Sequence, residues 1–324
     1  MTEKLPIVDI HPLFNTESTA YAEAANELYT ALSEVGFAVI VGHGVPDDTV
    51  KAMRGAIKAV FATPRDILAQ QTVEKGNYRG FVPLGYFTPN SGKGKADQYE
   101  AWKLHTETPL DHPICQESEL YGPNRWPSIN VEVKIPILTY WDDMTCVTNS
   151  ALSALCHVLK LDSDYILSCV DNPLTNMTLL NYPPSEGQDA WGIHPHKDFN
   201  LLTVLAHDPI GGLEVRNRDG VWLSANCPPD AMVMNVGDML ELWSGGRLLS
   251  TPHRVFNSSG LPRQSFPYFS VPRYDVVIEP LLPPLPGYER TPLHVGRSSA
   301  DIWYSNWPDT HSTEPGQELG DFHN

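Results

Sequence analysis

Two side chains that commonly bind metal ions lie two positions apart near the middle of the sequence. His196 and Asp198 are separated by a single lysine, in a segment that we expect to be an extended strand. Alternate residues of a strand project from the same face, so this imidazole and this carboxylate would point in one direction. A third ligand must come from a distant segment, and His253, on a later predicted strand, is the best candidate.

The types of these ligands indicate which metal they would hold. Two imidazoles and one carboxylate on one face of an octahedral ion leave three positions open, which is the arrangement of non-haem iron(II) oxygenases. A structural zinc site would instead be closed and usually rich in cysteine. A His-x-Asp pair alone is weak, because a chain with 12 histidines contains such pairs by chance, often as surface ion pairs. The prediction therefore depends on a second motif.

That second motif is an arginine and a serine that follow His253 after a run of turn-forming residues. Residues 253–257 and 263–271 are predicted to form a hairpin, in which Arg263 and Ser265 share a face. A guanidinium fork and a hydroxyl suit a carboxylate. Close to the metal, they would hold the far carboxylate of a chelating 2-oxo acid; away from it, they would be ordinary surface residues.

A tyrosine at the end of an earlier predicted strand could complete this carboxylate site. The hydroxyl of Tyr182 could donate a further hydrogen bond, although packing of its ring against the two following prolines explains it equally well. If Tyr182 faces the interior, alternation along the strand sends Leu180, Thr178 and Asn176 inward as well. These three residues are predicted substrate contacts, with core packing as the alternative for Leu180.

Further substrate contacts are expected from two other places. His194 lies two residues before His196 and could share its face, although Pro195 disturbs the strand. The irregular segment 78–103 is long for a loop, which is typical of a lid or binding loop. Its candidate residues, for each of which ordinary loop packing is the alternative, are Arg79, Phe81, Tyr86, Glu100 and Trp102. Trp303 is expected to dock a last short helix at about residues 297–307.

The elements that must position these side chains fall into two groups. The first half carries apolar residues at the three- and four-residue spacing of amphipathic helices. These predicted helices span residues 17–35, 47–62, 137–160 and 163–170, with one buried strand at 36–41. The second half alternates short β-rich runs with turns. Its predicted strands are Met177–Tyr182, Asn200–Ala206, Leu213–Arg216, Val221–Leu223, Ala231–Asn235, Met239–Trp243, His253–Asn257 and Ser265–Val271.

This order of elements predicts a mainly β protein with flanking helices. About eight short strands favour a closed or double-sheet antiparallel core. We expect one compound domain over residues 1–324, made of a mainly helical region at 1–170, the β-core at 171–280 and a C-terminal extension at 281–324.

Composition narrows the functional classes. A net charge of -17 repels phosphate backbones, so nucleic acid is an unexpected partner. No run of residues is apolar enough for a membrane helix, and the polar N-terminus is no signal peptide. The five cysteines are scattered and odd in number, which is typical of a reduced, cytoplasmic chain. Oligomeric state is not readable from these features.

Taken together, the motifs resemble a known enzyme family. The His196-x-Asp198, Ser250-Thr-Pro-His253 and Arg263-x-Ser265 motifs are similar to those of the iron(II)/2-oxoglutarate-dependent dioxygenases of the isopenicillin N synthase-like family. Other matching segments run along the chain. They are Leu5-Pro-Ile-Val-Asp-Ile10, residues 36–44, Asn181-Tyr-Pro-Pro184, Gly211-Gly-Leu-Glu-Val215 and Asn235-Val-Gly-Asp238.

The resemblance implies both a fold and a reaction. The fold is a double-stranded β-helix (jelly-roll, cupin-like) core with an N-terminal helical region. His196, Asp198 and His253 would bind Fe(II), and Arg263 with Ser265 would bind 2-oxoglutarate as co-substrate. O2 would then oxidise a small molecule, such as a secondary metabolite or an amino-acid-like compound, by hydroxylation, desaturation or ring closure. Succinate and CO2 would be released, and ascorbate could support the reaction in vitro.

Two other functions stay open at this point. Oxidases of the isopenicillin N synthase type keep the Arg-x-Ser pair but take their electrons from the substrate, and the run from Arg263 to Phe269 has some likeness to them. A non-catalytic jelly-roll binding module that keeps the metal for stability is the third possibility. The ligand motifs favour the 2-oxoglutarate-dependent enzyme over both.

Overall fold

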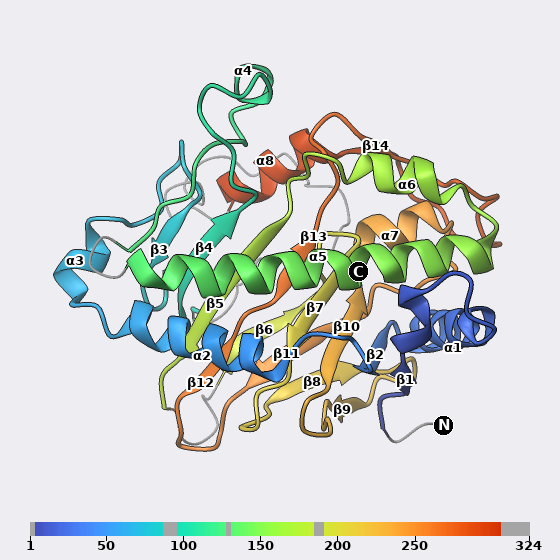
Figure 1. Ribbon diagram of the computed structural model, residues 1–324, viewed down its shortest axis with the longest axis horizontal. Helices are drawn as coiled ribbons and strands as arrows, with labels where there is room; N and C mark the ends of the chain where they lie inside the picture. Colours follow the sequence, from blue (N-terminus) through green and yellow to red (C-terminus); the bar gives the residue numbers. More distant parts are fainter. Residues whose placement is uncertain (1–3, 87–95, 128–130, 185–190, 306–324) are drawn as a thin grey trace.

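The computed structural model describes residues 4–86, 96–127, 131–184 and 191–305 (Figure 1). Within these ranges, long helices occupy the first half of the chain, as expected from the apolar spacing. The helices are η1 (His11–Phe14), α1 (Tyr21–Glu34), α2 (Asp47–Phe61), α3 (Arg65–Ala69), α4 (Ile114–Glu117), η2 (Val131–Val133), α5 (Lys134–Leu159), α6 (Ser163–Cys169), α7 (Asp238–Trp243) and α8 (Val295–Ser305).

The strands form a large sheet, a small sheet and an isolated pair. The large sheet has the order β1-β2-β10-β7-β13-β5-β4-β3, with β12 also paired to β5, and the small sheet has the order β6-β11-β8-β9. The strands are β1 (Ile7–Asp9), β2 (Phe37–Val41), β3 (Gly80–Val82), β4 (Glu100–His105), β5 (Asn176–Tyr182), β6 (Trp191–His196), β7 (Leu202–Ala206), β8 (Leu213–Arg216), β9 (Trp222–Ser224), β10 (Met232–Val236), β11 (His253–Phe256), β12 (Arg263–Ser265), β13 (Tyr268–Ser270), β14 (Val277–Ile278) and β15 (Leu293–His294).

The two faces of the large sheet bury different cores. Helix α5 runs across one face, with α1 and α2 beside it (Figure 1), and the residues of the sheet that pack there include Leu179, Val204 and Met234. The opposite face, which we call the inner face, packs on the small sheet through Leu180 and Val233 among others. Strand alternation explains this division, since successive side chains point to opposite faces.

Two local predictions differ from the structure. The sequence predicts a strand at Met239–Trp243, but these residues belong to helix α7, and all six residues of that helix are buried. A fully buried apolar run has no periodicity that separates a strand from a short helix. The predicted hairpin 253–257/263–271 is also wrong, because β11 pairs with β6 and β8, whereas β12 pairs with β5 in the other sheet. The turn between them carries the chain from one sheet to the other.

The large sheet extends into the N-terminal half of the sequence. Strands β3 and β4 lie in the segment expected to be irregular, and β4 pairs with β5 along its whole length. The expected boundary at residue 170 therefore falls between α6 and β5, but strands from both sides of it form one sheet.

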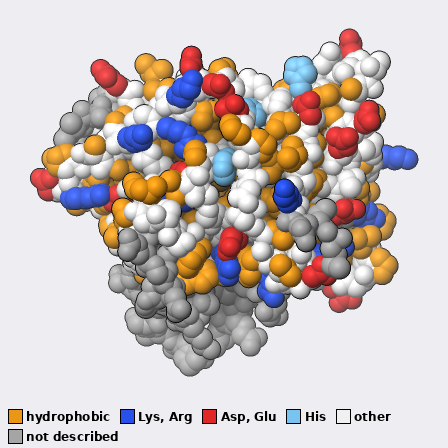
Figure 2. Space-filling view, turned by 90° about the horizontal axis from the view of Figure 1, so that it is seen from below, with side chains coloured by type: hydrophobic (Ala, Val, Ile, Leu, Met, Phe, Trp, Pro, Cys, Tyr) orange, Lys and Arg blue, Asp and Glu red, His pale blue; other side chains and the backbone are white. Residues whose placement is uncertain are grey.

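The surface carries charges of both signs. On the face drawn in Figure 2, acidic and basic side chains are interspersed with apolar ones. In the described ranges, no helix combines the length and the apolar character needed to cross a membrane.

Candidate functional site

The three predicted metal ligands converge between the ends of two strands. His196 ends β6 and His253 begins β11, and the two residues are paired across these strands. Their Nε2 atoms lie 3.8 and 3.6 Å from Oδ1 of Asp198. Atoms bound about 2.1 Å from one ion lie roughly 3–4 Å apart. These three side chains could therefore hold one metal ion.

Main-chain carbonyls orient both imidazoles. Nδ1 of His196 lies 2.8 Å from the carbonyl oxygen of His194, and Nδ1 of His253 lies 3.2 Å from that of Thr251. A carbonyl only accepts, so each Nδ1 carries the proton and each Nε2 keeps its lone pair. The lone pairs of both rings are thus directed toward the carboxylate and the space beside it.

The large sheet holds the carboxylate ligand. Asp198 lies two residues beyond the end of β6, so its direction is not set by strand alternation as expected. Its Oδ2 accepts hydrogen bonds from Thr203 Oγ1 at 2.6 Å and from Asn235 Nδ2 at 2.8 Å. Oδ1 is left for a cation. Asn200 in turn donates to Thr203 at 2.8 Å, which fixes that hydroxyl.

Burial and charge favour the metal-binding protonation states of His196 and Asp198. Burial lowers the pKa of His196 to about 4, and the neighbouring His253 acts in the same direction. Burial alone would raise the pKa of Asp198, but the two histidines and the hydrogen bonds from Asn235 and Thr203 lower it overall. A neutral imidazole and an ionised carboxylate are the forms that bind metals.

Removing a donor to Asp198 should weaken metal binding. Asn235→Ala or Thr203→Val leaves a buried carboxylate oxygen short of one hydrogen bond, which costs about 1–3 kcal/mol of stability. Loss of such a supporting contact typically weakens metal binding roughly 10- to 100-fold. Titration of each variant with Fe(II) under anaerobic conditions measures this, and Asn226→Ala, on the surface, is the control. Equal affinities in all the proteins would show that these donors do not position the ligand.

A buried arginine faces the inner side of the large sheet. Arg263 and Ser265 are opposite Tyr182 and Leu180 in the pairing of β12 with β5, and both are buried. Arg263 Nε donates to the carbonyl oxygen of Gly211 at 2.7 Å, and its guanidinium lies 4.8 Å from the centre of the Tyr182 ring. Its Nη1 has no hydrogen-bond partner among the described residues. A buried cation with a free donor is suited to an anionic ligand.

Tyr182 is held against this arginine by a close approach of β6. A Cβ atom on Gly192 would lie 2.8 Å from two carbons of the Tyr182 ring, so only glycine fits there. Burial raises the pKa of Tyr182 to about 12, although Arg263 partly offsets this effect. The phenol therefore keeps its proton and can donate a hydrogen bond.

The other predicted residues of β5 differ in how far they are buried. Leu180 packs in the inner-face core with Tyr182, and Thr178 is buried on the same face. Asn176, at the start of the strand, is half-buried and lies opposite His105. The alternation predicted for this strand is therefore what the structure shows, while the substrate contacts themselves stay a prediction.

The side chain of His194 contacts Asp97 and Trp191. Its Nδ1 lies 2.6 Å from Oδ1 of Asp97, and its ring stacks on Trp191 with centres 5.3 Å apart. The imidazole is thus directed at Asp97, and the carbonyl of His194 is the part that orients His196.

Four of the five candidates in segment 78–103 do not lie on the inner face. Phe81 and Trp102 belong to the helix-side core, and Glu100 hydrogen-bonds Asn181 and pairs with Arg65. Arg79 is buried and donates to the carbonyl oxygen of Leu120. Phe81, Glu100 and Trp102 lie on strands β3 and β4, where alternation fixes the direction of each side chain, and a role of these residues in substrate binding stays a prediction. Tyr86 packs partly buried against the inner-face core.

Sequence reasoning missed the inner-facing residues of the same strand. Lys103 and His105 alternate with Trp102 and Leu104 on β4. Alternation of two large apolar residues with polar ones is the signal in the sequence that could have found them. The role of Thr203 has no such signal, because the expected strand at 200–206 does not show that its hydroxyl donates to the carboxylate of nearby Asp198.

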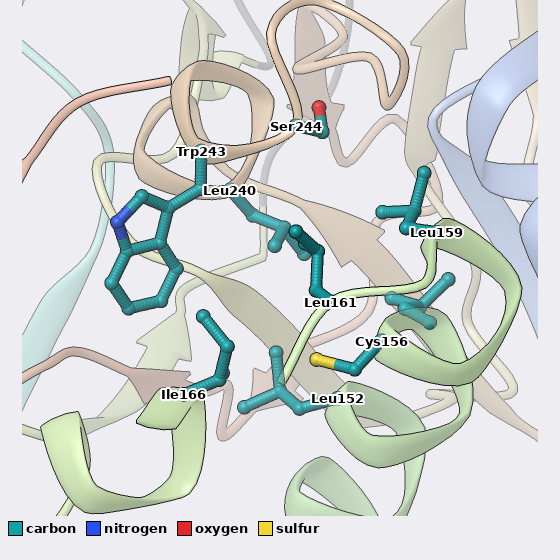
Figure 3. A pocket seen from close by; sticks show the side chains of 9 residues that line it. Leu152, Cys156, Leu159, Leu161, Ile166, Leu240, Trp243 and Ser244 are labelled. Atoms are coloured by element: carbon teal, nitrogen blue, oxygen red, sulfur yellow. The ribbon is translucent and has the colours of Figure 1, made fainter. Parts of the chain in front are cut away.

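A small cavity lies away from these residues. Its lining includes Leu152, Leu155 and Cys156 of α5, Ile166 of α6 and Trp243 of α7 (Figure 3). Burial raises the pKa of the Cys156 thiol to about 11, and Asp162 acts in the same direction, so it is not a reactive thiolate. The cavity is a packing gap between helices.

Comparison with known proteins agrees with this geometry. Residues 174–272 match the model of the 2OG-Fe(II) oxygenase superfamily, and residues 5–129 match that of the non-haem dioxygenase in morphine synthesis N-terminal region. A probable iron/ascorbate oxidoreductase of Dictyostelium discoideum is 32% identical over 303 residues, covering 84% of this chain and 82% of the relative. A homoarginine-6-hydroxylase of Glycine max is 28% identical over 294 residues, covering 86% and 88%.

Solved structures share the whole architecture. A 2OG-Fe(II) oxygenase family protein of Caulobacter crescentus has a TM-score of 0.79 at 28% identity, over 94% of this chain and 99% of that one. A protein of Neurospora crassa, solved in complex with alpha-KG and thymine, has a TM-score of 0.81 at 21% identity, over 94% and 97%, and shows the fold alone. The predicted jelly-roll fold class and family resemblance are confirmed. The chain belongs to the 2OG-Fe(II) oxygenase superfamily.

Proposed function

We propose that the protein is an Fe(II)- and 2-oxoglutarate-dependent dioxygenase in which His196, Asp198 and His253 bind the iron. The convergence of two Nε2 lone pairs and one free carboxylate oxygen carries this proposal. The donor set suits iron(II), because it leaves open positions. Arg263, Ser265 and Tyr182 would bind 2-oxoglutarate, and the free Nη1 of Arg263 fits its far carboxylate.

Bound iron(II) would supply the redox chemistry by which O2 converts 2-oxoglutarate to succinate and CO2 while the substrate is oxidised. The protein's own residues orient the reactants and exclude water. Arg263 and Tyr182 donate to one end of the 2-oxo acid, and Asn235 and Thr203 hold the carboxylate ligand. Of the two oxidising functions left open by the sequence, the 2-oxoglutarate-dependent one is supported, because relatives of this fold are solved with that co-substrate.

The substrate is a small molecule. Several relatives are named homoarginine-6-hydroxylases, which supports hydroxylation of an amino-acid-like compound; desaturation and ring closure use the same site. We expect a cytoplasmic enzyme that binds neither nucleic acid nor membranes, in line with its net charge of -17.

Consumption of 2-oxoglutarate tests the proposal directly. The purified protein is incubated with Fe(II), ascorbate, O2 and 2-oxoglutarate, with a panel of amino acids and their derivatives. We expect succinate to form slowly without substrate and faster with one member of the panel. Anaerobic addition of 2-oxoglutarate to the iron-loaded protein should also produce a weak visible absorption band. Absence of both succinate and the band would contradict the proposal.

The metal-free protein should lose stability as the pH falls. An unfolded histidine titrates near 6.5, but burial lowers the pKa of folded His196 to about 4, so the unfolded state binds a proton first between these values. The contribution of His196 to the free energy of unfolding is therefore fully present above pH 6.5 and decreases as the pH falls toward 4. Urea midpoints across this range measure it. His196→Gln should flatten the profile, and an unchanged slope in this variant would contradict the assignment.

A further inference from the structure

A lysine on the inner face of the large sheet has no acidic partner among the residues that the structure describes. Lys103 lies on β4 between Trp102 and Leu104, which pack in the helix-side core, so Lys103 projects toward the inner face. Its ammonium donates to Thr178 Oγ1 at 3.2 Å and lies 5.0 Å from the centre of the Tyr78 ring. No carboxylate in the described ranges forms an ion pair with it.

These contacts position the ammonium without neutralising it. Burial lowers the pKa of Lys103 to about 8, and no neighbouring acid counteracts this effect. Lys103 is half-buried, and partial removal of an unpaired ammonium from water is costly. A hydroxyl and an aromatic face stabilise the cation only in part. An anion beside this ammonium would supply the counter-charge that the described residues do not.

Lys103 lies beside the proposed 2-oxoglutarate site but outside it. Ser265 and Ala101 are both opposite Leu180, and Lys103 is opposite Thr178, the next residue of β5 on the same face. Two residues along a strand correspond to about 7 Å. An anion held by Lys103 would thus be a second ligand, in addition to the carboxylate held by Arg263.

A histidine and two aromatic rings lie next to Lys103 on the inner face. His105 is the next inner-facing residue of β4; its Nε2 donates to the carbonyl oxygen of Tyr78 at 3.1 Å, and its Nδ1 has no partner among the described residues. The ring of Trp303 lies 4.6 Å from that of His105 and stacks on Tyr78 at 5.3 Å. Trp303 of helix α8 thus lies against a histidine with a free ring nitrogen, on which two cations act, Arg79 and Lys103.

We propose that Lys103 binds an acidic group of the substrate, so that the enzyme acts on a small carboxylic acid anchored by this ammonium. This inference rests on the proposed function and adds the class of its substrate. Thr178 and Tyr78 hold the ammonium in place before the acid arrives, which reduces the entropy lost on binding. The carboxylate would supply the counter-charge that the ammonium of Lys103 lacks among the described residues.

Binding of matched acids and amides tests this without turnover. The anaerobic protein is saturated with Fe(II) and 2-oxoglutarate, and small acids are compared with their primary amides, beginning with 3-phenylpropionate and 3-phenylpropanamide. After [13C]methylation of lysines, the resonance that is missing in Lys103→Met identifies Lys103. We expect acids to bind at least about tenfold tighter than amides and to shift this resonance, while amides leave it unchanged.

Variants separate a binding role from a structural one. Lys103→Met should abolish the preference for acids and leave the melting temperature unchanged or higher, because an unpaired, half-buried charge is removed. Lys103→Arg should restore part of the preference, and Lys58→Met, on the exposed side of α2, is the control. The proposal is overturned if no acid of the panel is preferred, if Lys103→Met keeps the preference, or if it only lowers stability. Failure of the proposed function would instead appear as absence of iron-dependent succinate formation.

Discussion

Asp198→Ala should lower iron-dependent succinate formation on the order of a thousand-fold. The carboxylate is the one anionic ligand of the three, and a bound metal contributes several kcal/mol to such reactions. Its removal also leaves Asn235 and Thr203 directed at an empty position. Succinate is measured in the wild type and the variant at saturating Fe(II), together with the iron that each protein retains after desalting.

A matched substitution distinguishes loss of the metal from general damage. Asp219→Ala removes an exposed aspartate and should keep full activity and iron content. Circular dichroism should show that Asp198→Ala remains folded. If the folded variant retained iron and most of its activity, another residue would have to be the acidic ligand.

Arg263→Met should raise the KM for 2-oxoglutarate on the order of a hundred-fold. The buried guanidinium has a free Nη1, and truncation of one partner of a buried charge pair costs about 2–5 kcal/mol. The effect on kcat should be smaller, because the metal ligands are not touched. Initial rates over a wide range of 2-oxoglutarate concentration measure both constants.

Arg254→Met is the matched control for this substitution. Arg254 lies on β11 next to His253, but its side chain pairs with Glu214 at 2.7 Å and lies over the Trp222 ring. We expect its KM for 2-oxoglutarate to stay within about twofold of the wild type. A comparable rise in both variants would mean that loss of positive charge, rather than a specific contact, weakens binding of the co-substrate.

The three candidate metal ligands are predictable, because histidine and aspartate restrict the possible chemistry even when their surroundings are unknown. His196, Asp198 and His253 can be identified before any contact is known, and Arg263 and Ser265 can be identified from the carboxylate they could bind. Their geometry is less predictable. The hairpin expected to place Arg263 does not exist, and the pairing of β12 with β5 places it instead.

The substrate-facing residues are harder to predict, because they depend on strand parity. A shift of one residue exchanges the two faces of a strand. The aromatic ring of Trp102 makes it a candidate, but it packs against the helices, while Lys103 beside it faces inward. The alternation along β4 separates Trp102 from Lys103, but which of its two faces points inward follows from the pairing of β4 with β5, which joins segments about 75 residues apart in the chain.

The support of Asp198 by the opposite sheet has a consequence for assembly of the enzyme. Both histidines come from the small sheet. Thr203 and Asn235, which donate hydrogen bonds to Asp198, come from β7 and β10 of the large sheet. An ion bound by His196, His253 and Asp198 would therefore link the small sheet to the large one. Iron loading should therefore slow the opening of the sandwich, so that protease resistance of the purified protein reports how much of it carries metal.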